Sequence, residues 1–216
     1  LFFAVLVILT ACSSVKKVNS NKWISLWDGK TLSEWKFSEK PGTFSVVDGS
    51  IMVFGPRSHL YYVGPVANTN FKNFEFEAKV MTTKGSNSGI YFHTEYQDQN
   101  FPDKGFEVQV NNSHTDWKKT GGLYDILDTK DVIVKDDEWF TETIIVQGKH
   151  IITKINDKII TDYTEPENYV PLKNHVNRKI ATGTFALQGH DPKRCEWVFQ
   201  FLLRTSYPLH LIRESI

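Results

Sequence analysis

Beyond its N-terminus, the sequence contains few cysteines, no excess charge of either sign and no apolar run long enough to cross a membrane. Only two of its 216 residues are Cys, and 25 Lys and Arg balance 25 Asp and Glu. Balanced charge excludes affinity built on phosphate contacts, so we expect no nucleic-acid partner. Cys12 ends the apolar N-terminal segment, which leaves Cys195 without a partner for an internal disulfide. Aromatic residues make up 13% of the chain, so we expect a globular domain held by its core.

The N-terminal segment is apolar over residues 1–11, which read LFFAVLVILTA. It is too short to span a bilayer but is typical of the core of a signal peptide. Residues 9–12, LTAC, resemble a bacterial lipobox, where cleavage precedes a lipidated Cys. We therefore expect a signal peptide over 1–11, lipidation at Cys12 and a polar tether over 12–22. This predicts a protein of the bacterial cell envelope that is attached to the membrane only through its lipid anchor. The alternative is an ordinary secretory signal peptide with an incidental Cys.

Helical periodicity is scarce from Trp23 onward, and apolar and polar residues alternate instead. Strands are predicted at residues 74–80, 90–95, 106–110, 143–147, 151–155, 159–163 and 184–188. Residues 148–150 are expected to close a hairpin, and 156–158 to turn the chain into the next strand. Many short strands separated by Gly, Asn and Asp favour an all-β sandwich or jelly roll. No Gly- or Pro-rich linker interrupts the pattern, so we predict one domain over residues 23–203.

Unusual polar side chains occupy one face of several predicted strands. Glu107 and Gln109 share the face opposite Phe106, Val108 and Val110, with Asn111 next in line. The same parity groups His93 with Glu95, and Gln188 with His190. Amide and imidazole groups suit sugar hydroxyls because they both donate and accept hydrogen bonds, although an ordinary solvated face is the alternative. Two long stretches without a clear period, 111–138 and 164–182, flank these strands and are candidates for functional loops.

Other catalytic signatures are weak or missing. His59, His114 and His190 could ligate a metal, but no HExxH or CxxC spacing supports this, so a divalent metal stays an open alternative and no cofactor is specified. No GxSxG elbow is present. The Gly-rich residues 85–89 lack the Gly-Lys-Ser/Thr of a phosphate loop and lead into a strand, which favours a plain loop.

Several short motifs follow one another between residues 24 and 198. The first are LWDGKTLSEW at 26–35, FSVVDGSI at 44–51 and FKNFEF at 71–76. The more specific ones are GSNSGIYFH at 85–93, GFEVQV at 105–110, TGGLY at 120–124 and LQGH at 187–190. In this order and spacing they resemble the 3-keto-disaccharide hydrolase family.

The resemblance implies a concanavalin-A-like jelly roll, two curved antiparallel sheets with a carbohydrate cleft on the concave side. It also implies cleavage of glycosides that a partner sugar 3-dehydrogenase has oxidised at C3. A 3-ketone acidifies the C2 hydrogen, so a base can start an elimination that expels the C1 substituent, and hydration completes the reaction. Glu107 and His190 are the candidate base and acid, in either order. The candidate substrate-binding residues are Asn87, His93, Gln109, Asn111, Tyr124 and Gln188.

Two rival functions remain, and the C-terminus departs from the family pattern. A non-catalytic carbohydrate-binding module is the main rival. A conventional glycosidase would need a second carboxylate beside Glu107, for which Glu95 or Asp125 could serve. After Phe199 the sequence no longer resembles the family's closing strand, so residues 204–216 are expected to form an atypical tail and the sandwich to expose an edge.

Overall fold

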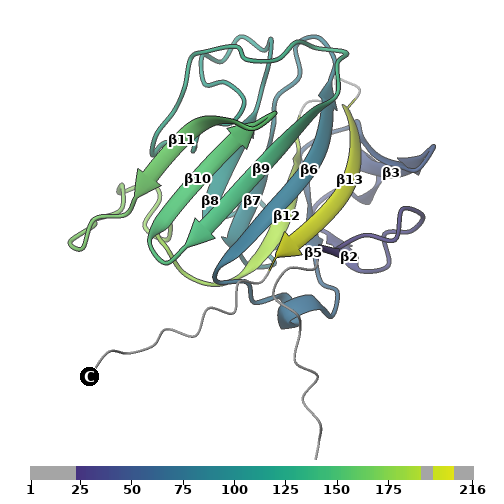
Figure 1. Ribbon diagram of the computed structural model, residues 1–216. Coiled ribbons are helices and arrows are strands. Elements are labelled where there is room, and N and C mark those ends of the chain that lie inside the picture. Colours follow the sequence, from purple (N-terminus) through teal and green to yellow (C-terminus); the bar gives the residue numbers. More distant parts are fainter. Residues whose placement is uncertain (1–22, 191–196, 207–216) are drawn as a thin grey trace, which may run out of the picture.

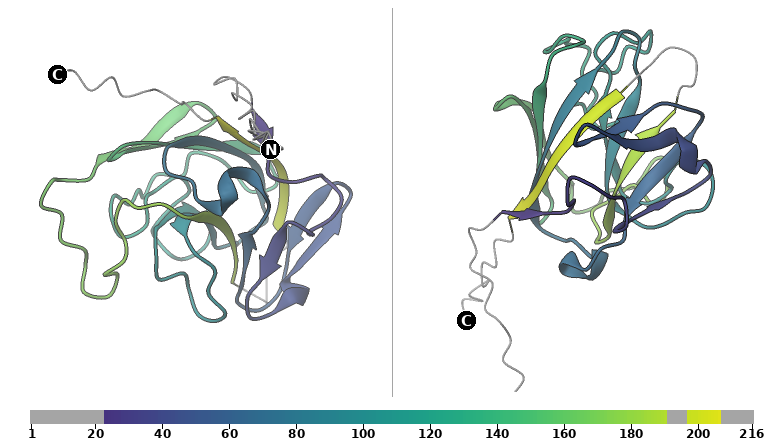
Figure 2. Two further views of the ribbon diagram at one scale, coloured as in Figure 1. Left: turned by 90° about the horizontal axis from the view of Figure 1, so that it is seen from below. Right: turned by 90° about the vertical axis from the view of Figure 1, so that its right-hand side faces the viewer.

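The computed structural model describes residues 23–190 and the backbone of residues 197–206. These residues form two antiparallel sheets packed face to face (Figures 1 and 2). The larger sheet has the order β11-β10-β9-β6-β13-β4-β3, with β1 paired to β13, and the smaller sheet has the order β2-β5-β12-β7-β8. The strands are β1 (Ile24–Ser25), β2 (Trp35–Phe37), β3 (Phe44–Val47), β4 (Ser50–Val53), β5 (Ser58–Tyr62), β6 (Phe74–Thr82), β7 (Ser88–Thr94), β8 (Phe106–Val110), β9 (Phe140–Gln147), β10 (His150–Ile155), β11 (Lys158–Thr164), β12 (Thr184–Gly189) and β13 (Trp197–Ser206).

The predicted all-β sandwich is confirmed. In Figure 1 the larger sheet lies in front, with β8, β7 and β12 behind it. Within the described part of the chain, the helical elements are the short 3-10 turns η1 (Pro41–Thr43) and η2 (Val66–Thr69). None of the described helices is long and apolar enough to cross a membrane.

Tight turns connect the three strands at one edge of the larger sheet. β9 and β10 form the predicted hairpin, with Gln147 opposite His150 and Gly148 in the left-handed region at φ 59°. Between β10 and β11, Asn156 and Asp157 both have positive φ, as a two-residue hairpin turn of the right twist requires. Asn and Asp tolerate that conformation better than most side chains.

The core lies between the two sheets and is rich in phenylalanine. Phe76 of the larger sheet stacks on Phe185 of the smaller sheet, with ring centroids 4.5 Å apart. Phe92 and Phe106, on neighbouring strands of the smaller sheet, stack at 5.3 Å. Because alternate side chains of a strand point to opposite faces, these inward aromatic rings leave the intervening residues on the outer face of the smaller sheet.

The closing strand of the sandwich differs from the sequence-based expectation. We expected the chain after Phe199 to leave an edge exposed, but β13 lies between β6 and β4 and extends past the expected boundary at residue 204. Strand pairing uses backbone groups and tolerates a change of side chains. The pairing of β13 with β6 is irregular in this part of the strand, where the register shifts between Gln200 and Arg204. The predicted signal peptide, Cys12, the tether and the rest of the expected tail lie outside the described residues.

Candidate active site

A cavity of about 560 Å³ opens on the face of the smaller sheet that points away from the core. Its sheet-derived lining comes from Tyr91 on β7, Glu107 and Gln109 on β8, and Gln188 on β12. Asn87 precedes β7 and His190 follows β12, while the loops contribute residues 100–103, 116, 124–125, 174–175 and 178. The structure thus brings together six predicted site residues: Asn87, Glu107, Gln109, Tyr124, Gln188 and His190.

Glu107 lies on β8, the last strand of the smaller sheet, and it is buried, with 5% of the residue exposed. It pairs with Tyr91 across β7 and β8, and the Tyr91 hydroxyl lies 2.8 Å from Glu107 Oε2. The same hydroxyl lies 2.9 Å from Gln188 Oε1. When Glu107 is protonated it can donate to Tyr91, whose hydroxyl then donates to Gln188; when ionised, Glu107 accepts from Tyr91.

Gly89 provides the space in which the Glu107 side chain lies. A Cβ at residue 89 would approach Glu107 Oε1 to 2.4 Å and its Cγ to 2.7 Å, both closer than side-chain atoms tolerate. Gly89 is the last residue of the Gly-rich segment 85–89. Glycine at this position leaves room for the Glu107 carboxyl group, and this gives the segment a role other than phosphate binding.

The environment of Glu107 tunes it for proton transfer. Burial raises the pKa of Glu107 to about 7, opposed by the nearby charge of Arg178 and the hydrogen bond from Tyr91. Burial and the adjacent Glu107 raise the pKa of Tyr91 well above its ordinary value, which keeps Tyr91 protonated as a donor. A carboxyl group with a pKa near neutrality can act as general base or general acid.

The segment 120–124 pairs with β8 and brings Tyr124 beside Glu107. Tyr124 N–H donates to the Glu107 carbonyl at 2.9 Å, and Gly121 N–H donates to the Gln109 carbonyl at 2.9 Å. The Gly121 carbonyl in turn accepts from the hydroxyl groups of Thr153 and Thr161 on β10 and β11. The TGGLY motif therefore joins the larger sheet to the floor of the cavity.

Charged side chains from the loops form part of the cavity wall, and of these only Asp125 was named from the sequence, as a possible second carboxylate. Asp125 accepts from Lys118 Nζ and lies 3.0 Å from His175 Nε2, which links two loops. Arg178 donates from a terminal nitrogen to the Tyr124 carbonyl at 2.7 Å. Lys118 Nζ lies 3.7 Å from the centre of the Tyr124 ring, a cation–π contact.

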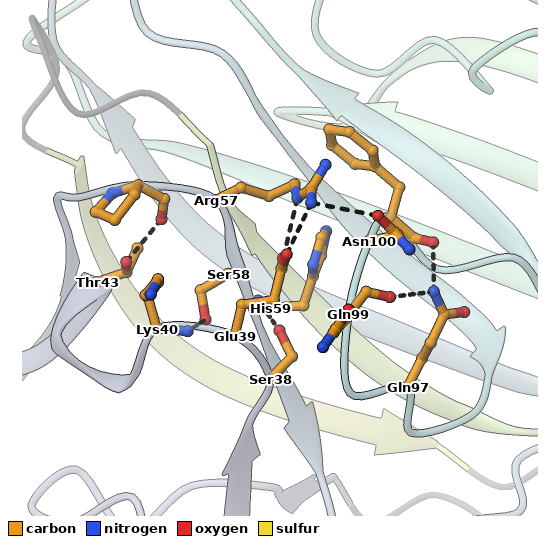
Figure 3. A network of polar contacts seen from close by, with 12 residues as sticks. Ser38, Glu39, Lys40, Thr43, Arg57, Ser58, His59, Gln97, Gln99 and Asn100 are labelled. Atoms are coloured by element: carbon orange, nitrogen blue, oxygen red, sulfur yellow. Dashed lines mark hydrogen bonds and ion pairs between the residues drawn. The ribbon is translucent and has the colours of Figure 1, made fainter.

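Residues 100–103 form another part of the cavity wall, which a polar network holds in place (Figure 3). Arg57, which directly precedes β5, forms a bidentate ion pair with Glu39, at 2.9 and 2.7 Å, and contacts Asn100 Oδ1 at 3.3 Å. The neighbouring Phe101 ring lies 5.1 Å from the Arg57 guanidinium and 5.4 Å from the His190 ring. The wall therefore positions an aromatic surface against His190.

Two amides form a fixed pair in the cavity lining. Gln109 Nε2 donates to Asn87 Oδ1 at 2.9 Å. This contact orients the two side chains, which come from neighbouring segments, relative to each other.

His93 and Asn111 do not line the cavity, contrary to expectation. His93 adopts a φ of 54°, which interrupts the alternation of β7; its Nε2 lies 2.9 Å from the Lys72 carbonyl and its ring packs on Phe74. Asn111 Nδ2 donates to the carbonyl groups of Asp116 and Lys118 at 3.0 and 2.7 Å. Asn111 therefore supports the loop that leads to Tyr124 and does not face the cavity.

The candidate carboxylates and metal ligands are also separated by the fold. Glu95 is outside the cavity lining and forms an exposed ion pair with Lys104 at 2.8 Å, whereas Asp125 lies in the lining. Among residues 23–190 no group of three or more His, Cys, Asp and Glu side chains is arranged to hold a metal ion. His114 uses Nδ1 to accept from Asp116 N–H, and His59 is fully buried.

Comparison with known proteins assigns the domain. Residues 22–199 match the model of a family described as 3-keto-alpha-glucoside-1,2-lyase-like domains. The chain belongs to this family. The match ends at the residue after which the sequence departs from the family pattern, and it covers every side chain of the cavity lining.

Relatives of this family member agree in sequence and fold. A 3-keto-disaccharide hydrolase of Bacteroides thetaiotaomicron is 26% identical over 175 residues, covering 68% of this chain but only 60% of that protein. A candidate glycosyl hydrolase from Parabacteroides distasonis has a TM-score of 0.71 at 18% identity, covering 85% of this chain and 93% of its own. The carbohydrate-binding module CBM66 from Bacillus subtilis reaches 0.55 at 12% identity, covering 81% and 96%. These structures show the lectin-like fold, while the family and the relative support a glycoside hydrolase-like function on carbohydrates.

Proposed function

We propose that the protein cleaves 3-keto-glycosides or 3-keto-disaccharides by elimination and hydration. The observation that carries the proposal is Glu107, a buried carboxyl group with a pKa of about 7, bonded to Tyr91 in a cavity that also contains His190. The family description names a 1,2-lyase activity on 3-keto-alpha-glucosides, and the Bacteroides relative is named for 3-keto-disaccharides. Both names fit a site whose central group is a base.

The reaction begins when ionised Glu107 removes the proton from C2 of the substrate. The C2–H electron pair forms a C2–C3 double bond, and the carbonyl electrons move to the C3 oxygen. When the carbonyl group re-forms, a C1–C2 double bond forms and the C1–O bond breaks, with a proton passing to the leaving oxygen. Water then adds to C1 and a proton returns to C2, which gives the free 3-keto sugar.

The lining residues divide these tasks. Glu107 is the base, and His190 is placed to protonate the leaving oxygen. The amides of Asn87, Gln109 and Gln188 hold sugar hydroxyls, and the aromatic ring of Tyr124 faces the same cavity. Such groups supply orientation and acid–base assistance, which together account for large parts of enzymatic rate enhancement.

The surroundings of the reaction are also part of the proposal. A dehydrogenase that oxidises C3 of the sugar must supply the substrate. The predicted signal peptide and Cys12 support a location of this protein in the cell envelope, on the membrane through its lipid anchor. Cys12→Ser is expected to release the protein from membranes, and retention of the variant in the membrane fraction would contradict the anchor.

A conventional glycosidase is the second candidate, because Asp125 and Glu107 line the same cavity. The deciding experiment incubates the protein with 3-keto-trehalose and with unoxidised trehalose, each with and without EDTA. Cleavage of the keto sugar alone supports elimination, and loss of that cleavage in EDTA adds a metal to it. Cleavage of unoxidised trehalose supports the conventional mechanism. Cleavage of neither sugar by the folded protein contradicts the proposal for these substrates and favours a binding module.

A further inference from the structure

Arg178 is a buried cation in the lining of the cavity. It lies in the loop between β11 and β12, a stretch whose sequence has no clear period, and only 4% of the residue is exposed. One terminal nitrogen donates to the Tyr124 carbonyl at 2.7 Å, and the guanidinium lies 5.6 Å from the Tyr124 ring centre. Tyr124 is itself bonded through its N–H to the Glu107 carbonyl, so Arg178 is held close to the proposed base.

No carboxylate of the described residues lies within 4 Å of the Arg178 guanidinium, and Glu107 and Asp125 act on its charge only from further away. The ion pairs found within 4 Å among these residues involve other cations, including Lys118 with Asp125. A buried guanidinium is normally paired, since an isolated buried charge is strongly disfavoured. None of the Arg178 nitrogens is enclosed without a partner, so its remaining N–H groups reach the cavity.

The missing partner is a charge that forms during the reaction rather than a permanent anion on the substrate. The cavity lining already contains Glu107, Asp103, Asp116 and Asp125, and these carboxyl groups disfavour a substrate that arrives negatively charged. A neutral 3-keto sugar meets no such repulsion. Its C3 oxygen becomes negative only when C2 loses its proton, and a planar guanidinium suits a planar enolate with an adjacent hydroxyl.

We propose that Arg178 holds the C3 oxygen of the substrate and stabilises the enolate formed at C2 and C3. The inference rests on the proposed function and adds a catalytic residue to it. When Glu107 takes the C2 proton, the electron pair displaced onto the C3 oxygen meets the N–H groups of Arg178. The pair returns as the carbonyl group re-forms and the leaving oxygen departs. Arg178 only donates hydrogen bonds in this step and neither gains nor loses a proton.

The test compares Arg178→Gln with Lys179→Gln, an exposed cation at the next position of the same loop. Loss of one group that stabilises an oxyanion typically lowers kcat by about 10²–10³-fold. We expect Arg178→Gln to lose kcat on a 3-keto-glucoside by that factor, with a smaller change in KM and an unchanged Kd for the unoxidised glucoside. Lys179→Gln is expected to match the wild type. Guanidinium ion added to Arg178→Ala is expected to restore part of kcat.

Two further readouts separate catalysis from structure. Because the charge of Arg178 holds down the pKa of Glu107, Arg178→Gln is expected to move the rise of kcat/KM to higher pH. Arg178→Lys keeps the charge but not the planar fork, and we expect intermediate activity with wild-type Tm.

Three results would overturn the assignment. One is wild-type kcat in Arg178→Gln while the wild-type protein cleaves the keto sugar. Another is an equal loss of affinity for oxidised and unoxidised glucosides, which would make Arg178 a general binding residue. The third is a wild-type protein that cleaves only unoxidised glycosides, a result that removes the proposed function and the enolate together.

Discussion

Glu107 and Glu142 are two buried glutamates in different sheets of the same sandwich. Burial raises the pKa of Glu107 to about 7 and the pKa of Glu142 well above its ordinary value. Glu107 faces the cavity beside Tyr91 and Arg178. Glu142 lies on β9 between Phe140 and Ile144, which share its inward face, and neither of its carboxyl oxygens meets a hydrogen-bond partner among the described residues.

The difference shows that a raised pKa alone does not identify a catalytic group. Desolvation acts on both carboxyl groups, but only Glu107 combines it with a donor, a nearby cation and access to a cavity large enough for a sugar. Glu142 is enclosed by the core, and burial alone raises its pKa. The two residues therefore provide a matched pair in which chemistry and stability can be separated.

The largest expected effect comes from removing the base. Glu107→Gln keeps the shape of the side chain but cannot accept the C2 proton, so kcat/KM on a 3-keto-glucoside is expected to fall by about 10²–10⁴-fold. Glu142→Gln, the matched control, is expected to keep kcat/KM close to wild type. Steady-state kinetics on both variants checks this, and equal activities in the two variants would break the comparison.

The second prediction concerns the free energy of unfolding, where Glu142 is the residue that is expected to matter. A carboxyl group whose pKa is raised in the folded state stabilises the fold less as pH rises above its unfolded pKa, which for Glu142 is near 4.5. The loss is about 1.4 kcal/mol per pH unit until the folded pKa is reached. Glu142→Met is therefore expected to gain stability over the wild type as pH rises from 5 to 8. Urea unfolding at several pH values measures this, and a difference independent of pH would contradict it.

A smaller effect is expected when Glu107 loses its donor. The Tyr91 hydroxyl stabilises the ionised carboxyl group, so Tyr91→Phe removes a contribution that lowers the pKa of Glu107. The rise of kcat/KM with pH, expected near pH 7 in the wild type, should move to higher pH. A pH–rate profile checks the shift, and movement to lower pH would show that Tyr91 does not act on the ionised form.

The smallest effect is expected from the ion pair that supports residues 100–103 in the cavity wall. The Arg57–Glu39 ion pair is partly exposed, with side-chain exposures of 37% and 16%, and such pairs contribute about 0.2–1 kcal/mol. Arg57→Gln should loosen residues 100–103 and raise KM by at most about fivefold, with kcat unchanged. A loss of kcat comparable to that of Glu107→Gln would mean that the wall takes part in the chemistry.

The sequence predicts the strands from β6 to β12 because apolar and polar residues alternate along them, whereas β1 to β5 and β13 were not predicted. β6 and β8 follow the pattern of their residues, and parity grouped Glu107 with Gln109 on one strand and Gln188 with His190 on another, while only the family resemblance joined the two groups into one site. Glu142 was missed because the predicted strand began at residue 143, whereas β9 begins at Phe140.

Parity failed where the backbone leaves the regular strand conformation. The positive φ of His93 redirects its side chain to Phe74, and nothing in the alternation of residues 90–95 indicates this. Arg178, Asp125 and His175 lie in loops without periodicity, and their positions depend on long-range contacts such as the bonds from Thr153 and Thr161 to the Gly121 carbonyl. Such contacts form only when the two sheets pack, so local sequence carries no signal for them.

The most direct test of the account is the fate of the hydrogen at C2. The protein is incubated with 3-keto-trehalose in D₂O, and the free 3-keto sugar is analysed for deuterium at C2, against the same sugar kept in D₂O without protein. Elimination followed by hydration predicts one deuterium at C2 in each enzymatically released 3-keto sugar, because water supplies the proton that returns to that carbon. Release of a 3-keto sugar that retains its original hydrogen at C2, together with no kinetic isotope effect when C2 of 3-keto-trehalose carries deuterium, would contradict proton abstraction and point to direct displacement at C1.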